Sequence, residues 1–246
     1  MKTLKSVKEW MDKRRTWFLF DQISDRYDVM NCLMTFGLDQ QWRLAMIRLI
    51  PQLGRGSHGL DLASGTLDVA IKTVITREDV DHVLAMDMSE NMLAVGQKKR
   101  DQLRLQSKIS IQVGDACQIP CDDAQFDFVT MSFGIRNVED YSKALFEILR
   151  CLKPEGALLI LETSVPENGL LRTCHRVYMD HVMPKMACLI TGQKTAYDYL
   201  GQSAQQFPSG QAFLDELKKV GFERVSRSSR CLGAVSIYMA HKQALS

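Results

Sequence analysis

The stretch Gly59-Leu60-Asp61-Leu62-Ala63-Ser64-Gly65-Thr66-Leu67-Asp68 sets the architecture expected of this 246-residue chain. It begins apolar, reaches an acidic residue, turns through small residues and then enters a segment with a helical pattern. A buried parallel strand delivers its carboxyl end to a helix in this way, and the free N–H groups there can hold a ligand. We therefore expect Asp61, Gly65 and Thr66 to take part in a ligand site, with Gly65 letting the backbone approach the ligand closely.

Strand and helix patterns alternate from His58 onward. The expected strands cover 58–63, 82–87, 109–114, 126–132 and 157–162, and the expected helices cover 68–76, 90–104 and 138–152. Strands separated by helices are typical of a parallel sheet covered on both faces and joined by right-handed crossovers. Later in the chain a helix is expected at 209–220. It is followed by strands at 222–230 and 233–241, which are close enough to pair as an antiparallel hairpin at the sheet edge.

The chain reads as one α/β domain without repeats or low-complexity linkers. Its expected parts are an N-terminal helical cap (1–50), a ligand-binding core (57–165), a helical insert (166–206) and a C-terminal helix with two strands (207–246). A chain of this length can bury a full core.

Composition excludes several function classes. The formal net charge of +2 does not favour nucleic acid as a partner. Seven cysteines without paired spacing fit a reduced, cytoplasmic compartment, and Cys117 with Cys121 lacks the further ligands that a metal site needs. No secretory signal or spanning apolar run is visible, so we expect a protein that is soluble or at most peripheral at the inner face of a membrane.

Three further elements follow strands of the same sheet. Asp87 ends one strand and can accept hydrogen bonds from both hydroxyls of a ribose. Asp115 with Ala116 ends the next and can meet an adenine amino group and ring nitrogen, and Ser132 ends the fourth. Each aspartate alone also fits a helix N-cap or a solvated strand end. Together they favour a nucleoside site at the carboxyl edge of the sheet.

Two other nucleotide sites are disfavoured. A dinucleotide fingerprint needs G-x-G-x-x-G between strand and helix, whereas the run 63–68 contains Gly65 alone. A Walker-type phosphate loop is absent, because no Gly-Lys-Ser/Thr follows a glycine-rich turn. The site therefore suits a nucleoside without phosphates.

The chain resembles the ubiquinone/menaquinone biosynthesis C-methyltransferases, which are Rossmann-like class I S-adenosylmethionine-dependent enzymes. The resemblance covers about 20–241. The segments that carry it are Phe20-Asp21, Tyr27-Asp28-Val29-Met30-Asn31, Ser132-Phe133-Gly134-Ile135-Arg136-Asn137-Val138, Leu152-Lys153-Pro154-Glu155-Gly156, Tyr197-Asp198-Tyr199-Leu200 and Phe207-Pro208. The run 132–138 is the most specific of these.

This resemblance implies a seven-stranded, mostly parallel sheet and S-adenosyl-L-methionine as cofactor. It also implies that the cofactor is bound by Thr66, Asp87, Asp115, Ala116 and Ser132. The implied substrate is a polyprenylated quinol methylated on a ring carbon, with naphthoquinol and benzoquinol both open.

Five positions depart from the family pattern. Leu67 and Glu155 stand where glycine is usual, Thr163 and Val165 where Phe and Lys are usual, and Tyr238 where His is usual. The side chain of Leu67 must point away from the ligand if cofactor affinity is to be kept.

Methyl transfer from a sulfonium to carbon requires an electron-rich ring carbon behind the methyl group. Ionising the neighbouring phenol supplies it, and we expect Arg136 to stabilise the phenolate. Asn137 can orient the same oxygen, and Tyr27 can position the ring or relay a proton. The alternative for Arg136 and Asn137 is a capping turn with a surface salt bridge. His175 and His181 could supply a base or be ordinary helix residues.

The N-terminal segment mixes Trp10, Trp17, Phe18 and Phe20 with basic residues. Such a helix can lie on lipid or pack on the domain with its basic side in water, and both alternatives stay open, as does a homodimer. Two other functions are also kept: methylation of another lipophilic phenol or sterol-like acceptor, and a degenerate cofactor-binding protein inactivated by Leu67.

Overall fold

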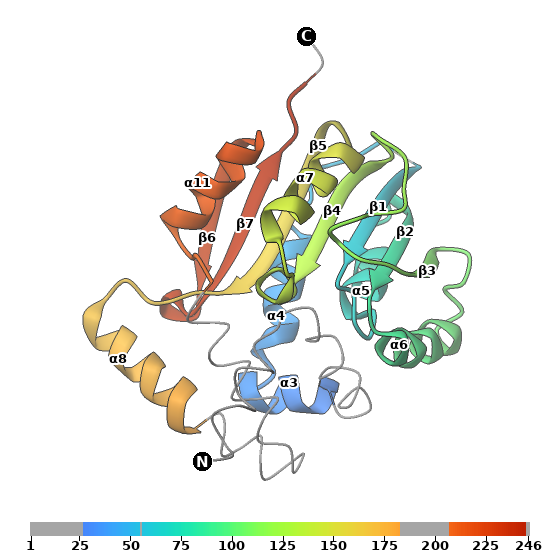
Figure 1. Cartoon of the computed structure of the whole chain (residues 1–246). Coiled ribbons are helices and arrows are strands. Elements are labelled where there is room, and N and C mark those ends of the chain that lie inside the picture. The colour runs from blue at the N-terminus through green and yellow to red at the C-terminus, as the bar shows by residue number, and fades with distance from the viewer. Residues whose placement is uncertain (1–26, 55, 183–206, 245–246) are drawn as a thin grey trace, which may run out of the picture.

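The computed structural model describes residues 27–54, 56–182 and 207–244, and within them seven strands form one sheet. The order is β3-β2-β1-β4-β5-β7-β6 (Figure 1). The bounds are Ser57–Leu62 for β1, Val80–Asp87 for β2, Ile109–Val113 for β3, Phe126–Ser132 for β4, Leu152–Thr163 for β5, Glu223–Arg230 for β6 and Val235–His241 for β7. The first five pair in parallel and β7 pairs antiparallel with both β5 and β6, as the sequence predicts.

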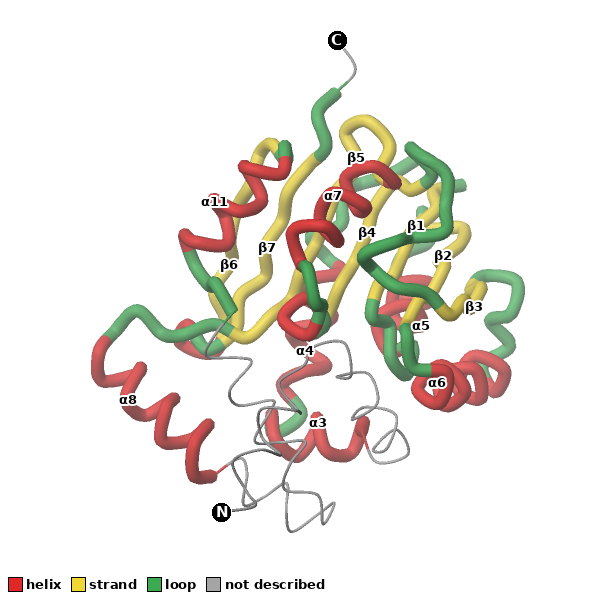
Figure 2. Tube along the Cα trace, in the orientation of Figure 1, coloured by secondary structure: helices red, strands yellow, loops and turns green. Residues whose placement is uncertain are grey.

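Helices cover both faces of this sheet (Figures 1 and 2). The bounds are Leu38–Ile47 for α4, Asp68–Thr76 for α5, Glu90–Gln102 for α6, Tyr141–Cys151 for α7 and Gln211–Val220 for α11. Apolar side chains of α7 and α11 are buried in one core cluster, and those of α4, α5 and α6 in another. The central strands are buried between the two clusters, which explains why their sequences are rich in apolar residues.

Two element boundaries differ from the sequence prediction by more than two residues. The helix expected from 138 begins at Tyr141, because residues Ile135–Asn137 form the 3-10 turn η3 and the Asp140 carboxylate caps α7 by accepting from the Lys143 N–H. Strand β5 begins at Leu152 rather than 157 and carries Pro154 through a register shift. Proline is tolerated at such an irregularity, where no ladder hydrogen bond is needed.

Helix α3 (Tyr27–Thr35) of the cap and helix α8 (Gly169–Val177) of the insert lie beyond the carboxyl ends of the parallel strands, whereas α4 packs on a face of the sheet (Figure 1). The cap contains α3 and α4, and the insert contains α8 followed by the π-helix η4 (Tyr178–Val182). The predictions for 1–26 and 183–206, including the aromatic and basic residues of the N-terminus, Tyr197 and Tyr199, lie outside the described residues. In the described part of the chain no helix is long and apolar enough to cross a membrane.

Candidate active site

Asp87 fixes the glycine loop between β1 and α5. Its Oδ2 accepts a hydrogen bond from the Gly65 N–H at 2.9 Å, and its Oδ1 accepts from the Ser89 N–H at 2.9 Å. Burial raises the pKa of Asp87, although these backbone donors lower it. The carboxylate predicted for ribose binding thus lies directly against the loop that would bind the same cofactor.

A small cavity of about 20 Å³ lies behind this loop. It is lined by Asp61, Ser64, Gly65, Thr66 and Ser132, among others. Among the described residues, Asp61 Oδ2, Ser64 Oγ and Ser132 Oγ are buried without a hydrogen-bond partner. A cavity of this size holds one small polar group, and buried polar atoms require partners. The unsatisfied oxygens therefore fit a polar ligand group such as an ammonium.

Asp61 is the most perturbed carboxyl in this cavity. It is 1% exposed, and its Oδ1 accepts from the Thr130 hydroxyl at 2.7 Å. Burial raises its pKa to about 7 despite that hydrogen bond. A carboxyl of this kind is ready to ionise when a cationic group arrives beside it.

Asp115 and Ala116 follow β3, at the same edge of the sheet. The Asp115 carboxylate accepts from the Cys117 N–H at 2.8 Å and is exposed, whereas Ala116 is buried. Their part in adenine binding stays a prediction. No cluster of possible metal ligands occurs among the described residues, and there Cys117 and Cys121 are both free thiols.

The Leu67 side chain points away from the ligand cavity, as cofactor binding requires. The φ of Leu67 is 66°, in the left-handed region, which explains why glycine suits this position. The side chain is wholly buried in the core rather than in the ligand cavity. Space for it exists because residue 96 is glycine: a Cβ there would lie 2.3 Å from Leu67 Cδ1. Glu155, the other substitution for glycine, also has positive φ, at 63°.

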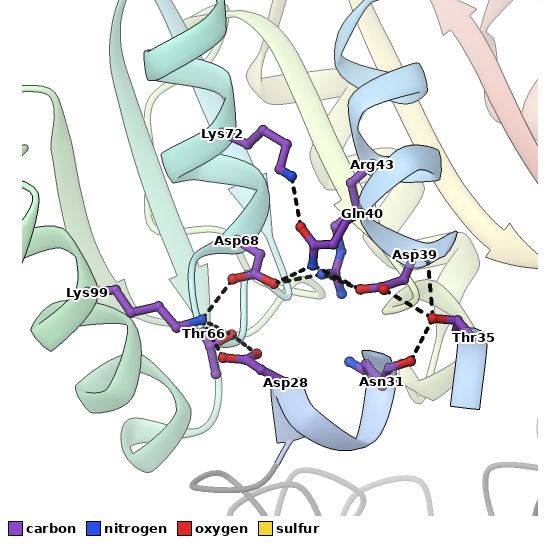
Figure 3. Close-up of polar contacts among 10 residues, drawn as sticks. All are labelled: Asp28, Asn31, Thr35, Asp39, Gln40, Arg43, Thr66, Asp68, Lys72 and Lys99. Carbon is purple, nitrogen blue, oxygen red and sulfur yellow. Dashed lines mark hydrogen bonds and ion pairs between the residues drawn. The ribbon is translucent and has the colours of Figure 1, made fainter. Parts of the chain in front are cut away.

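A polar cluster on four helices surrounds the start of α5 (Figure 3). Asp68 accepts from Arg43 of α4 at 2.7 Å and from Lys99 of α6 at 2.7 Å, and Lys99 also pairs with Asp28 of α3 at 2.5 Å. Thr66 donates to Asp28 at 2.6 Å. Burial alone would raise the pKa of Asp68, but Arg43 and Lys99 hold it below its ordinary value. We call Asp28, Arg43, Asp68 and Lys99 the clasp, because they tie the cap to the cofactor loop.

A second, much larger pocket of about 410 Å³ lies beside the cap. Its walls are mostly apolar and come from α3, α4, the end of β4, η3, α8 and the segment before β7. The two cavities meet at consecutive residues, since Ser132 lines the small one and Phe133 the large one. A cofactor and an acceptor bound in them would therefore adjoin.

Arg136 lines the large pocket and forms a buried ion pair with Glu162. Arg136 is 8% exposed and Glu162 is wholly buried, so the surface-salt-bridge alternative is wrong. Glu162 also accepts from the Thr163 N–H at 2.7 Å, and the Arg136 Nε is buried without a partner among the described residues. Glu162 therefore holds the guanidinium in place, and the Nε–H of Arg136 is left to donate to a ligand.

The other predicted catalytic residues have different outcomes. Asn137 donates to the Phe133 carbonyl at 3.3 Å and does not line the large pocket, while its Oδ1 is buried without a partner in the described region. Tyr27 begins α3, but its side chain lies outside the described part of the structure. His175 lines the large pocket and His181 does not. Sequence reasoning missed Glu162, Arg43 and Lys99, whereas Asp28 and Asp68 lay within motifs it had singled out.

The fold is that of the Rossmann-like class I S-adenosylmethionine-dependent methyltransferases. A methyltransferase of this kind from Thermotoga maritima superposes with a TM-score of 0.63 at 20% identity, covering 93% of this chain and all of that one. Phosphoethanolamine N-methyltransferase 2 of Haemonchus contortus, solved with S-adenosyl-L-methionine, gives 0.61 at 17% identity, covering 82% of this chain and 52% of that one.

The chain belongs to the ubiE/COQ5 methyltransferase family, whose model matches residues 8–242. Similar relatives include the ubiquinone/menaquinone biosynthesis C-methyltransferases of Rickettsia bellii and Rickettsia felis, each 39% identical over 91% of both chains. The resemblance inferred from the motifs is therefore confirmed.

Proposed function

We propose that this protein transfers the methyl group of S-adenosylmethionine to a ring carbon of a polyprenylated demethylquinol; its relatives are named as ubiquinone/menaquinone biosynthesis C-methyltransferases. The observation that carries the proposal is a guanidinium, Arg136, held by buried Glu162 in the wall of a mostly apolar pocket that adjoins the cofactor cavity. A phenolate is the kind of anion that such a donor stabilises in a water-poor site.

The proposed cofactor fits the residues present. Asp61 and the unsatisfied hydroxyls would hold its amino-acid end, Asp87 its ribose, and Asp115 with Ala116 its adenine. When bound, it supplies an electrophilic methyl group. The degenerate-protein alternative loses its main support, because the Leu67 side chain lies in the core and does not fill the cavity.

The pocket opening suits an isoprenoid tail. Phe36 and Leu232 line the pocket, yet each is 77% exposed. An apolar mouth of this kind would let a hydrocarbon chain leave the pocket without burying polar groups. A sterol-like acceptor or another lipophilic phenol would fit through the same mouth. The mouth therefore does not distinguish these acceptors from a polyprenylated quinol, and assays of ring methylation by Arg136 variants are needed for that.

Arg136→Gln should lower kcat on the true quinol by about 10²- to 10³-fold, as expected when one donor to a developing anion is lost. The single variant leaves the buried Glu162 carboxylate without a partner, which can itself impair folding. The double variant Arg136→Gln/Glu162→Gln has no such unpaired charge, so its loss of activity reports on the missing guanidinium. Arg176→Gln, on the exposed side of α8, should leave kcat unchanged. Undiminished turnover by the folded Arg136 variants would argue for a different acceptor.

Naphthoquinol and benzoquinol acceptors can be separated in the host. Removal of the protein should cause one demethylated quinone to accumulate, and its ring identifies the natural acceptor. Normal levels of every methylated quinone would contradict the proposal.

A further inference from the structure

The proposed reaction requires a proton acceptor that Arg136 cannot provide. An arginine side chain stays protonated in proteins, whereas a phenol has a pKa near 10 and must lose its proton to activate the ring. The acceptor must line the same pocket as Arg136 and be neutral near pH 7.

His175 of α8 meets both requirements. It is half-buried in the pocket wall, and none of the described residues hydrogen-bonds to its imidazole. Burial lowers its pKa, outweighing the opposite effect of the nearby Asp180 carboxylate, so the ring is neutral at pH 7. A neutral imidazole facing the acceptor pocket can take a proton.

The other titratable groups that line this pocket are ion-paired, already hydrogen-bonded, or thiols. Asp39 is 1% exposed and pairs with Arg43 at 2.9 Å. Tyr178 donates its hydroxyl to the Met34 carbonyl at 2.5 Å, and burial raises its pKa. The thiols of Cys174 and Cys231 also line the pocket and are tested below as serines.

We infer that His175 is the general base of this methyltransferase, accepting the hydroxyl proton of the phenolic acceptor while Arg136 stabilises the resulting phenolate. The ring carbon then bonds to the methyl group as the carbon–sulfur bond of the sulfonium breaks, and the bonding pair stays on sulfur. The methylated carbon loses its hydrogen as a proton while the oxygen regains one, so one proton is released per turnover. This inference rests on the proposed function.

The test compares pH profiles of kcat/KM for wild type, His175→Gln and His181→Gln on a short-tailed demethylquinol. His175→Gln should lose about 10²-fold at pH 7, lack the acid limb of wild type, and recover as rising pH ionises the substrate. A ring-fluorinated, more acidic quinol should restore much of its activity. His181→Gln and Cys174→Ser/Cys231→Ser should retain the acid limb.

Two results would overturn the role of His175: an acid limb that stays at the wild-type midpoint in His175→Gln, or an equal loss on the ordinary and the acidic quinol. NMR titration of the imidazole must also give a pKa below the ordinary 6.5. Cofactor binding by His175→Gln, measured by calorimetry, verifies folding. Absence of turnover by wild type would overturn the proposed function together with this role, whereas wild-type turnover with an unaffected variant overturns the role alone.

Discussion

Leu67 occupies a left-handed backbone position at the edge of the cofactor loop, and Gly96 on α6 provides the space for its side chain. A non-glycine residue costs about 1 kcal/mol in this conformation. Burial of a leucine stabilises by more than that, about 2 kcal/mol. The substitution is therefore accommodated by the core and leaves the cavity clear.

Gly96→Ala tests this packing. In wild type the new methyl would meet Leu67 Cδ1 and the Thr66 carbonyl carbon, so stability should fall by about 2 kcal/mol. With Leu67→Gly already present, the contact with Cδ1 is gone while that with the Thr66 backbone remains, so the added cost should be smaller by about 1 kcal/mol. Urea unfolding of the four proteins measures the coupling, and additive effects within about 0.5 kcal/mol would show that the two residues do not interact.

The raised pKa of Asp61 predicts how cofactor binding depends on pH. With a pKa of about 7, it is mostly protonated at pH 6 and half ionised at pH 7, and only the ionised form attracts a cationic group. Affinity for S-adenosylmethionine should therefore rise about fivefold from pH 6 to pH 7, below the pKa of about 7.7 of an α-amino group. Calorimetry should show a flat profile for Asp61→Asn, and an equally steep one would assign the titration to another group.

The clasp links α3, α4, α5 and α6 around the first turn of α5. Arg43 is 6% exposed and forms ion pairs with two carboxylates, so Asp68 as well as Asp39 compensates its positive charge. Breaking a buried pair leaves a charge without compensation. The cap is therefore held by electrostatics at the point where the cofactor loop ends and α5 begins.

Asp68→Asn should destabilise the protein by about 2 kcal/mol at pH 7 and reduce hydrogen-exchange protection in α4. Because folding lowers the pKa of Asp68, its ionised form stabilises the fold above the unfolded pKa of 3.8, and the benefit disappears as pH falls through the lower folded pKa. The two proteins should thus converge in stability as pH falls below 3.8 and through the folded pKa of Asp68. Glu167→Gln, which removes an exposed pair with Arg227, should change stability by less than about 0.5 kcal/mol. Equal effects of both substitutions would contradict the clasp.

The elements that sequence predicted best are those with strong local signals. Strands β1, β2, β3 and β4 were located within two residues, because continuous apolar runs end in polar turns. The start of β5 was missed, since Pro154 and Glu155 are atypical of a strand until the register shift accommodates them. The clasp could not be predicted, because its four residues come together only through the packing of four helices.

At the scale of the whole molecule, the candidate site consists of two cavities that meet at the end of β4. The residues proposed to bind the cofactor could be selected from the sequence because they follow strands directly, and ligands bind at such strand ends in open α/β sheets. The Glu162 partner of Arg136 was not, because nothing in the apolar run of β5 indicates that its last acidic residue faces η3. The large pocket depends on the cap, the insert and the C-terminal segment together, and no single motif specifies it.

The central claim is that the large pocket brings a quinol ring to the methyl group of the cofactor. The most direct measurement incubates the purified protein with S-adenosylmethionine and a reduced, short-tailed demethylquinol and examines the ring by mass spectrometry and NMR. We expect a product with one new methyl on the unsubstituted ring carbon, formed by wild type and at least about 10²-fold more slowly by Arg136→Gln/Glu162→Gln. A quinol recovered unchanged, or methylated on oxygen, would contradict the account.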